Sequence, residues 1–177
     1  MAALSPAELE ARLRLHALPA IGPRRMSRLL DVFGSASAAL SAPASAWRSL
    51  GLPAEAAEQR RSSSTRDSAA QALAWLEQAD HHLLCLHDPD YPALLAELTD
   101  APPLLFVQGD PAVLERPQIA MVGSRRASKP GLQSAEAFAR CLAQSGFVVT
   151  SGLALGIDGA AHRGALAGGL TVAVLGT

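Results

Sequence analysis

Two short glycine-containing segments hold the polar side chains whose types and spacing could do chemistry. The first, "VGSRRASKPG" (122–131), follows a short apolar run and presents three cations within five residues. The second, "TSGLALGID" (150–158), follows another apolar run. Glycine allows a sharp turn and a close approach to a ligand, and free amides at the start of a following helix attract anions. The two segments therefore predict a phosphate site.

The side chains of both segments suit phosphate oxygens. Arg125 can donate two parallel hydrogen bonds to one phosphate group, and Lys129 adds a further positive charge. The glycines expected to approach the ligand and the hydroxyl donors are Gly123, Gly152, Ser124, Ser128 and Ser151. In open parallel sheets, loops that follow neighbouring strands lie together at one edge, so both segments should line one pocket.

The overall charge conceals a local excess of cations. The 177 residues carry a formal net charge of -1, with 49% hydrophobic and 18% charged residues, which is a globular composition. Between residues 116 and 163 there are only two acids, Glu136 and Asp158. The cations of the same stretch are Arg116, Arg125, Arg126, Lys129, Arg140 and Arg163. A basic patch of this kind indicates an anionic partner.

Known nucleotide fingerprints do not fit either segment. Neither GxGxxG with a downstream acid nor GxxxxGK[ST] is present, so a dinucleotide cofactor or a P-loop nucleotide is disfavoured and no cofactor is expected. Asp158 and His162 are four residues apart and should share a helix face. They could form an acid/base couple, or Asp158 could hydrogen-bond His162 to fix the loop. No activated nucleophile is visible nearby, which favours the structural pair.

Metal and disulfide chemistry is not indicated. His81, His82 and His87 lack partners at zinc spacing. Cys85 and Cys141 are far apart with no CxxC, and we expect both to be small core residues. The amino-terminal segment lacks the pattern of a signal peptide, and no segment is long enough to span a bilayer, so a reducing, cytoplasmic setting with no membrane contact is expected.

Helical patterns dominate the first part of the chain. Ser5, Pro6 and Glu8 suit the first turn of a helix, where serine and glutamate can satisfy each other's backbone amides. Apolar spacings of three and four predict further helices up to residue 79, including short ones at 36–40 and 44–50 and a longer one at 54–78. The serine run "RRSSSTRDS" weakens the last of these and could be a hinge. We expect a helical domain over residues 1–80.

After residue 80, short apolar runs alternate with helical ones. Strands are expected at 82–87, 103–108, 118–124, 147–151 and 170–176, with helices at 92–97, 130–144 and 157–167. This alternation predicts an α/β domain over residues 81–177 with a doubly wound parallel sheet, covered by helices on both faces. The final "VLGT" is a strand end and glycine turn that should lead into another crossover, so the sheet is expected to be truncated here.

The segment "LHALPAIGPRRMSRLL" (15–30) has the outline of a helix-hairpin-helix element. Glycine-turn amides in such hairpins can contact DNA phosphates. Ala20 stands where the first glycine usually occurs, and Arg24, Arg25 and Arg28 follow the turn. A purely structural hairpin explains the pattern equally well.

With these residues in view, the chain strongly resembles the DNA-processing protein A family (DprA/Smf). "VGSRRAS" and "SGLALGIDGAAHRGALAGGLTVAVLGT" carry the resemblance, and "LHDPDYPALLAELTDAPPLLFVQGD" is similar to that family's entry into its extended Rossmann domain. The helical first part looks like its SAM-like domain. The resemblance implies a phosphate-binding loop at Gly123, Ser124 and Arg125. It implies a second loop with Ser151, Gly152, Ala154, Gly156 and Asp158, and we expect support from Arg126, His162 and Arg163.

The resemblance also implies a function. Such a protein binds incoming single-stranded DNA in natural transformation and helps load the RecA recombinase, without being an enzyme, and the full-length family forms homodimers. The alternative is a nucleotide-processing phosphoribohydrolase of related fold. Enzymes of that class carry P-G-G-x-G-T-x-x-E, whereas Gly168-Gly169 here follows Ala167 and no glutamate comes after it.

Overall fold

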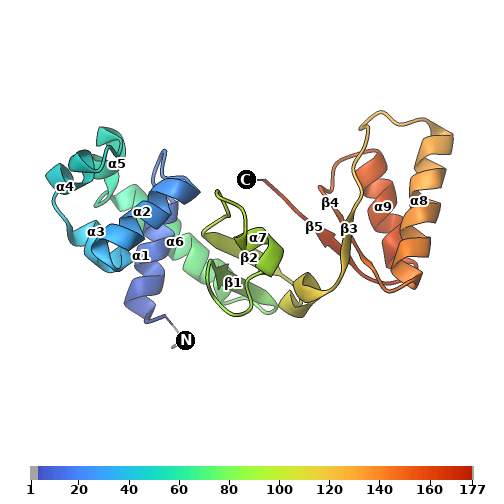
Figure 1. Cartoon of the computed structure of the whole chain (residues 1–177), viewed down its shortest axis with the longest axis horizontal. Helices are drawn as coiled ribbons and strands as arrows, with labels where there is room; N and C mark the ends of the chain where they lie inside the picture. Colours follow the sequence, from blue (N-terminus) through green and yellow to red (C-terminus); the bar gives the residue numbers. More distant parts are fainter. Residues whose placement is uncertain (1–3, 177) are drawn as a thin grey trace. The chain divides into compact units, whose positions relative to one another are not determined.

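The structure, a computed structural model, describes residues 4–176 and consists of two compact units that divide between Asp110 and Pro111 (Figure 1). As far as these residues show, the first unit contains six helices followed by a two-stranded antiparallel sheet with a seventh, short helix between its strands. The second contains a three-stranded parallel sheet with two long helices. The expected α/β class, with a helical part ahead of a parallel sheet, is confirmed.

The helices of the first unit surround one apolar core. They are α1 (Pro6–His16), α2 (Pro23–Phe33), α3 (Ala36–Ser41), α4 (Ala44–Ser49), α5 (Ala54–Gln59) and α6 (Ser63–Leu76). Leu15, Leu29 and Trp47 are completely buried in it. The buried indole of Trp47 donates to the carbonyl oxygen of Ala39 at 2.8 Å, so the polar atom of this large side chain is satisfied.

The serine run after α5 ends one helix and starts the next. The single helix expected at 54–78 is wrong, because Arg60 to Ser62 separate α5 from α6. Ser62 has extended backbone angles, and its hydroxyl accepts a hydrogen bond from the Thr65 amide at 3.3 Å. Serine competes with the helix for backbone groups in this way, which makes it a better N-cap than a helix-interior residue.

The Glu8 side chain does not form the reciprocal N-terminal cap that the sequence predicts. The Ser5 hydroxyl does accept from the Glu8 amide at 3.3 Å, as expected. The Glu8 carboxylate, however, accepts from the amides of Ala36 and Ser37, at 2.8 and 3.0 Å. These amides begin α3, so Glu8 caps a different helix and joins α1 to α3. Burial raises the pKa of Glu8, but these hydrogen bonds outweigh burial and leave its pKa lowered.

The connection between α1 and α2 has the hairpin geometry that the sequence indicates. Ala20 adopts a positive φ of 58°, in the left-handed region where glycine is more common. Gly22 is the N-cap of α2. The Arg25 guanidinium donates to the Ala20 carbonyl oxygen at 2.6 Å and therefore braces the turn. DNA contact by this hairpin stays a prediction.

The first unit also contains β1 (His81–Cys85), α7 (Ala93–Ala96) and β2 (Leu104–Gln108). β1 and β2 pair with each other antiparallel, and they form a sheet separate from the parallel one. Cys85 and Leu104 are buried in the same core cluster as the helices. The boundary expected at residue 80 therefore falls inside the first compact unit.

The second unit begins with a 3-10 helix (Pro111–Glu115) and continues as two consecutive βαβ steps. Its elements are β3 (Gln118–Ala120), α8 (Lys129–Gln144), β4 (Val148–Ser151), α9 (Ile157–Leu166) and β5 (Thr171–Ala173). The strands lie in the order β3-β4-β5 and are parallel, with Val149 opposite both Ile119 and Thr171. Both long helices lie on one face of this sheet (Figure 1), so the expectation of helices on both faces is wrong for the part of the sheet that the structure describes.

α8 and α9 approach each other closely along a seam of small residues. Ala139, Ala161 and Ala165 have no exposed surface there. A Cβ built on Gly164 would lie 2.8 Å from the backbone carbonyl carbon of Glu136, so only glycine fits at this crossing. Cys141 is exposed, and its expected place in the core is wrong because it lies on the opposite side of α8 from Ala139. The seam fixes the position of both helix starts, where the glycine segments end.

Candidate nucleic-acid interface

Both glycine segments lie at the carboxyl ends of neighbouring parallel strands. The first glycine loop, residues 122–128, connects the β3 segment to α8, and the second glycine loop, residues 152–156, connects β4 to α9. The Met121 amide donates to the Thr150 carbonyl oxygen at 2.9 Å, just before the loops diverge from the sheet. This edge is where open α/β sheets bind their ligands.

The two loops pack directly against each other. Gly156 has a φ of 91°, and a Cβ built on it would lie 2.8 Å from the Cα of Arg125 and closer still to the Ser124 carbonyl oxygen. A Cβ on Gly123 would lie 2.7 Å from the side chain of Ile157. The Ile157 amide also donates to the Ser124 carbonyl oxygen at 3.2 Å. The Ile157 side chain therefore fills the space that a Cβ at position 123 would need, and the approach of Gly123 to a phosphate stays a prediction.

The exposed positive charge of the site belongs to the first glycine loop and the start of α8. Arg125, Arg126 and Lys129 are all exposed. Within residues 4–176 no ion pair involves any of these three side chains. The Ser124 hydroxyl accepts from the Arg126 amide at 3.0 Å and shapes the turn that presents both arginines. The loop therefore offers uncompensated cations to solvent.

Two further cations, Arg163 and Arg140, are partly neutralised. Arg163 on α9 lies 3.6 Å from a Glu136 oxygen, and Arg140 lies 3.5 Å from the other oxygen of the same carboxylate. Both pairs are exposed, so each contributes little to stability. Arg163 therefore brings a partly compensated charge to this part of the unit.

The helix starts offer fewer free amides than the sequence suggests. Ser128 is the N-cap of α8, and its hydroxyl accepts from the Gly131 amide at 3.3 Å, while Pro130 has no amide to donate. At the start of α9, the amides of Ile157 and Gly159 donate to carbonyl oxygens of Ser124 and Ala154. The site must therefore depend on its cations and hydroxyls more than on helix amides.

Ser151 has a structural partner. Its side chain is 4% exposed, and its hydroxyl donates to the Met121 carbonyl oxygen at 2.6 Å. This bond joins the end of β4 to the residue that precedes the first glycine loop. Gly152, which follows, is exposed, and a Cβ on it would lie 3.0 Å from an Asp158 carboxylate oxygen. Gly152 keeps the loop close to the Asp158 side chain, and this contact was not visible in the sequence.

Asp158 and His162 do not form the pair that the sequence favours. His162 is buried, and its Nδ1 lies 2.7 Å from the Thr171 hydroxyl, which itself donates to the Val149 carbonyl oxygen at 2.6 Å. Because that hydroxyl proton is already used, Nδ1 must donate to Thr171. His162 thus turns toward β5 and away from Asp158. Its Nε2 is buried and has no hydrogen-bond partner within residues 4–176.

Within residues 4–176 no three His, Cys, Asp or Glu side chains are grouped so that they could hold a metal ion. No helix in the same range is both long and apolar enough to cross a membrane.

Comparison with known proteins identifies a family for this chain. The family model described as DNA recombination-mediator protein A matches residues 82–177, which include both glycine loops. The chain belongs to this family. Protein Smf of Escherichia coli K12 is 45% identical over 119 residues, which cover 67% of this chain and 32% of that protein. The DNA processing protein DprA of Streptococcus pneumoniae R6 is 50% identical over 91 residues, covering 51% of this chain and 32% of that protein.

A solved structure extends the similarity to the first unit. The X-ray structure of DNA processing protein A from Streptococcus pneumoniae matches 99% of this chain and 59% of that one, with a TM-score of 0.70 and 29% identity. The chain spans about a third of the length of the curated members of the DNA recombination-mediator protein A family named above. The names of these relatives tie the family to DNA processing and recombination.

Proposed function

We propose that the chain binds the phosphate backbone of single-stranded DNA through the two glycine loops. The observation that carries this proposal is the exposed, uncompensated charge of Arg125, Arg126 and Lys129 at the carboxyl edge of a parallel sheet. Gly156 holds the second glycine loop against the backbone that carries Arg125, so both loops present one surface. Membership in a recombination-mediator family supports DNA as the source of the phosphates.

Backbone capture, and not base stacking, should dominate this binding. Neither glycine loop contains an aromatic residue, and aromatic residues make up only 4% of the chain. Stacking on aromatic side chains contributes about 1 to 3 kcal/mol per base where it occurs. Without it, affinity comes from phosphate contacts, which depend on salt and little on sequence.

Arg125→Ala is the decisive variant. Fluorescence anisotropy of a labelled oligothymidine should show weaker binding by about tenfold, the effect expected when a charge-assisted hydrogen bond is removed. Arg140→Ala is the matched control, since Arg140 is also an exposed arginine of this unit but is paired with Glu136 away from the loops. Equal affinities of Arg125→Ala and the wild type would contradict the proposal.

We further propose that the whole protein acts without catalysis in natural transformation, protecting incoming DNA in the cytoplasm and helping to load RecA as a homodimer. This extends the proposed DNA binding, and it rests on the family resemblance. RecA ATP hydrolysis on single-stranded DNA, measured with and without the full-length protein, tests the loading. Light scattering over a range of concentrations tests the dimer.

The alternative phosphoribohydrolase activity has little support in the structure. Gly168 and Gly169, which would belong to its phosphate loop, instead lie against the end of α8. A Cβ on Gly168 would lie 2.8 Å from the Arg140 carbonyl oxygen, and one on Gly169 would lie 2.9 Å from that of Ala143. Incubation with AMP should release no adenine, and chromatographic detection of adenine would reverse this assignment.

A further inference from the structure

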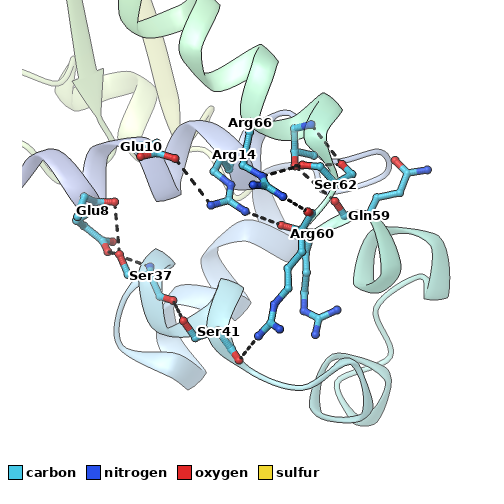
Figure 2. A network of polar contacts seen from close by, with 12 residues as sticks. Glu8, Glu10, Arg14, Ser37, Ser41, Gln59, Arg60, Ser62 and Arg66 are labelled. Atoms are coloured by element: carbon cyan, nitrogen blue, oxygen red, sulfur yellow. Dashed lines mark hydrogen bonds and ion pairs between the residues drawn. The ribbon is translucent and has the colours of Figure 1, made fainter.

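The first unit contains a pocket that the DNA-binding proposal does not use. Its volume is about 370 Å³, within the range of small-molecule sites. It lies where α1, the end of α3 and the start of α6 meet, and Figure 2 shows the polar side chains around it. The lining residues are Arg14, Leu40, Ser41, Arg61 and Arg66.

The three arginines of this pocket are held in place by neutral backbone groups. Arg14 donates to the Arg60 carbonyl oxygen at 3.0 Å, Arg61 to that of Ser41 at 3.0 Å, and Arg66 to that of Arg61 at 2.9 Å. A carbonyl oxygen orients a guanidinium without cancelling its charge. Each guanidinium has five N–H groups, so donors are left over for a ligand.

Charge compensation around the pocket is incomplete. Of the three lining arginines, only Arg14 has an ion-pair partner within the described residues, and the Glu10 oxygen lies 3.8 Å away. The Nε of Arg14 is buried without a hydrogen-bond partner in this part of the chain. Next to the pocket, burial first and then the nearby cations Arg61 and Arg48 lower the pKa of Arg60. An anion in the pocket would relieve this repulsion.

We propose that this pocket binds a phosphate dianion, either free phosphate or a terminal phosphate monoester. Such a group carries about -1.5 to -2 charges at pH 7 and several strong acceptor oxygens, which suits a pocket lined by three arginine side chains. A backbone phosphodiester has only one charge and matches the pocket less well. Leu40 is the only apolar lining residue and no aromatic lines the pocket, so recognition involves the phosphate and not an attached base.

The proposal predicts that Arg61 and Arg66 are required for phosphate binding. Both are exposed, so Arg61→Gln and Arg66→Gln should fold normally, which far-UV circular dichroism can verify. Calorimetric titration with inorganic phosphate at low ionic strength should show affinity about tenfold weaker in each variant. Arg66→Lys should lose less affinity than Arg66→Gln, because lysine keeps the positive charge although it lacks the planar fork of donors. Arg140→Gln, at an exposed arginine of α8 that pairs with Glu136, is the control and should bind as the wild type does.

A further variant separates this pocket from the glycine loops. Arg125→Ala should retain the phosphate affinity that Arg61→Gln and Arg66→Gln lose. If Arg125→Ala abolishes phosphate binding and the two pocket variants do not change it, phosphate binds only at the loops and the pocket proposal is wrong. In the Arg125→Ala protein, tighter binding of 5′-phosphorylated than of 5′-hydroxyl oligothymidine would identify a DNA end as the ligand. Binding of inorganic phosphate without that preference would identify the free anion.

Discussion

The Cα atoms of Gly156 and Arg125 are so close that a Cβ built on Gly156 would lie 2.8 Å from the Arg125 Cα. The residue expected to carry DNA binding therefore rests against a residue of the neighbouring loop. Any side chain at position 156 would push Arg125 away from its place at the sheet edge.

Gly156→Ala should destabilise the second unit and weaken DNA binding. The substitution places a side chain at a residue whose φ is 91°, where it is strained, and it also creates a steric clash. Together these two effects should lower the free energy of unfolding by more than about 2 kcal/mol. Gly146→Ala is the matched control, because Gly146 has a φ of 93° but open space around its Cβ position, so only the backbone cost of about 1 kcal/mol applies. Urea unfolding of both variants measures the difference. Equal stabilities would show that the loops can separate freely.

The salt dependence of DNA binding should report how many loop cations touch phosphates. If Arg125, Arg126 and Lys129 each neutralise one phosphate, the logarithm of affinity should fall against the logarithm of salt concentration with a slope of about -2. Replacing any one of them by glutamine should reduce the slope by about 0.7. Anisotropy titrations at four salt concentrations measure this. An unchanged slope for one variant would exclude that residue from phosphate contact.

Glu8 should make the first unit sensitive to acid. Its pKa is lowered in the folded state, so the stability it contributes is fully present above its unfolded pKa of about 4.3 and is lost as the pH falls through the lower folded value. Glu8→Gln should lower the free energy of unfolding by about 1 kcal/mol near pH 7 and by much less near pH 3. Thermal unfolding of both proteins between pH 7 and pH 3 measures it. A constant difference across this range would contradict the capping role.

The Thr171 hydroxyl should contribute more to the stability of the second unit than its partial exposure suggests. Thr171→Val leaves the buried His162 Nδ1 proton without its partner, which should cost about 1 to 3 kcal/mol. Thr150→Val is the control, since its hydroxyl donates to the exposed side chain of Gln118. Chemical unfolding should show a clearly larger loss for Thr171→Val. A similar loss for both would mean that water replaces the missing contacts.

Local sequence signals predicted most elements but not the partners of individual side chains. The helices at 130–144 and 157–167 were close to the observed bounds, because apolar periodicity and caps are local properties. The strands expected at 118–124 and 170–176 exist but are shorter, at Gln118–Ala120 and Thr171–Ala173. The carboxylate of Glu8 and the imidazole of His162 were placed wrongly, since Ala36 and Thr171 compete for them from distant positions in the chain. Similarly, nothing in the local sequence marks Ile157 as the side chain that fills the space at Gly123.

The pocket lined by Arg14, Arg61 and Arg66 could also not be predicted from the sequence. Arg61 and Arg66 are close in the sequence, one just before α6 and one within it, and the packing of α1 brings the distant Arg14 to them. That link between Arg14 and the other two arginines is not visible in the sequence. By contrast, Arg125, Arg126 and Lys129 stand within five residues, so their shared location could be read directly.

The seam between α8 and α9 changes how the alanine-rich composition should be understood. On exposed helix faces, drift toward alanine can accumulate as a neutral effect of genome composition. Ala139, Ala161 and Ala165, by contrast, have no exposed surface, and at Gly164 even alanine would be too large. Purifying selection should therefore act on the small residues of this seam, while alanines on exposed helix faces are free to vary among descendants of the same ancestor.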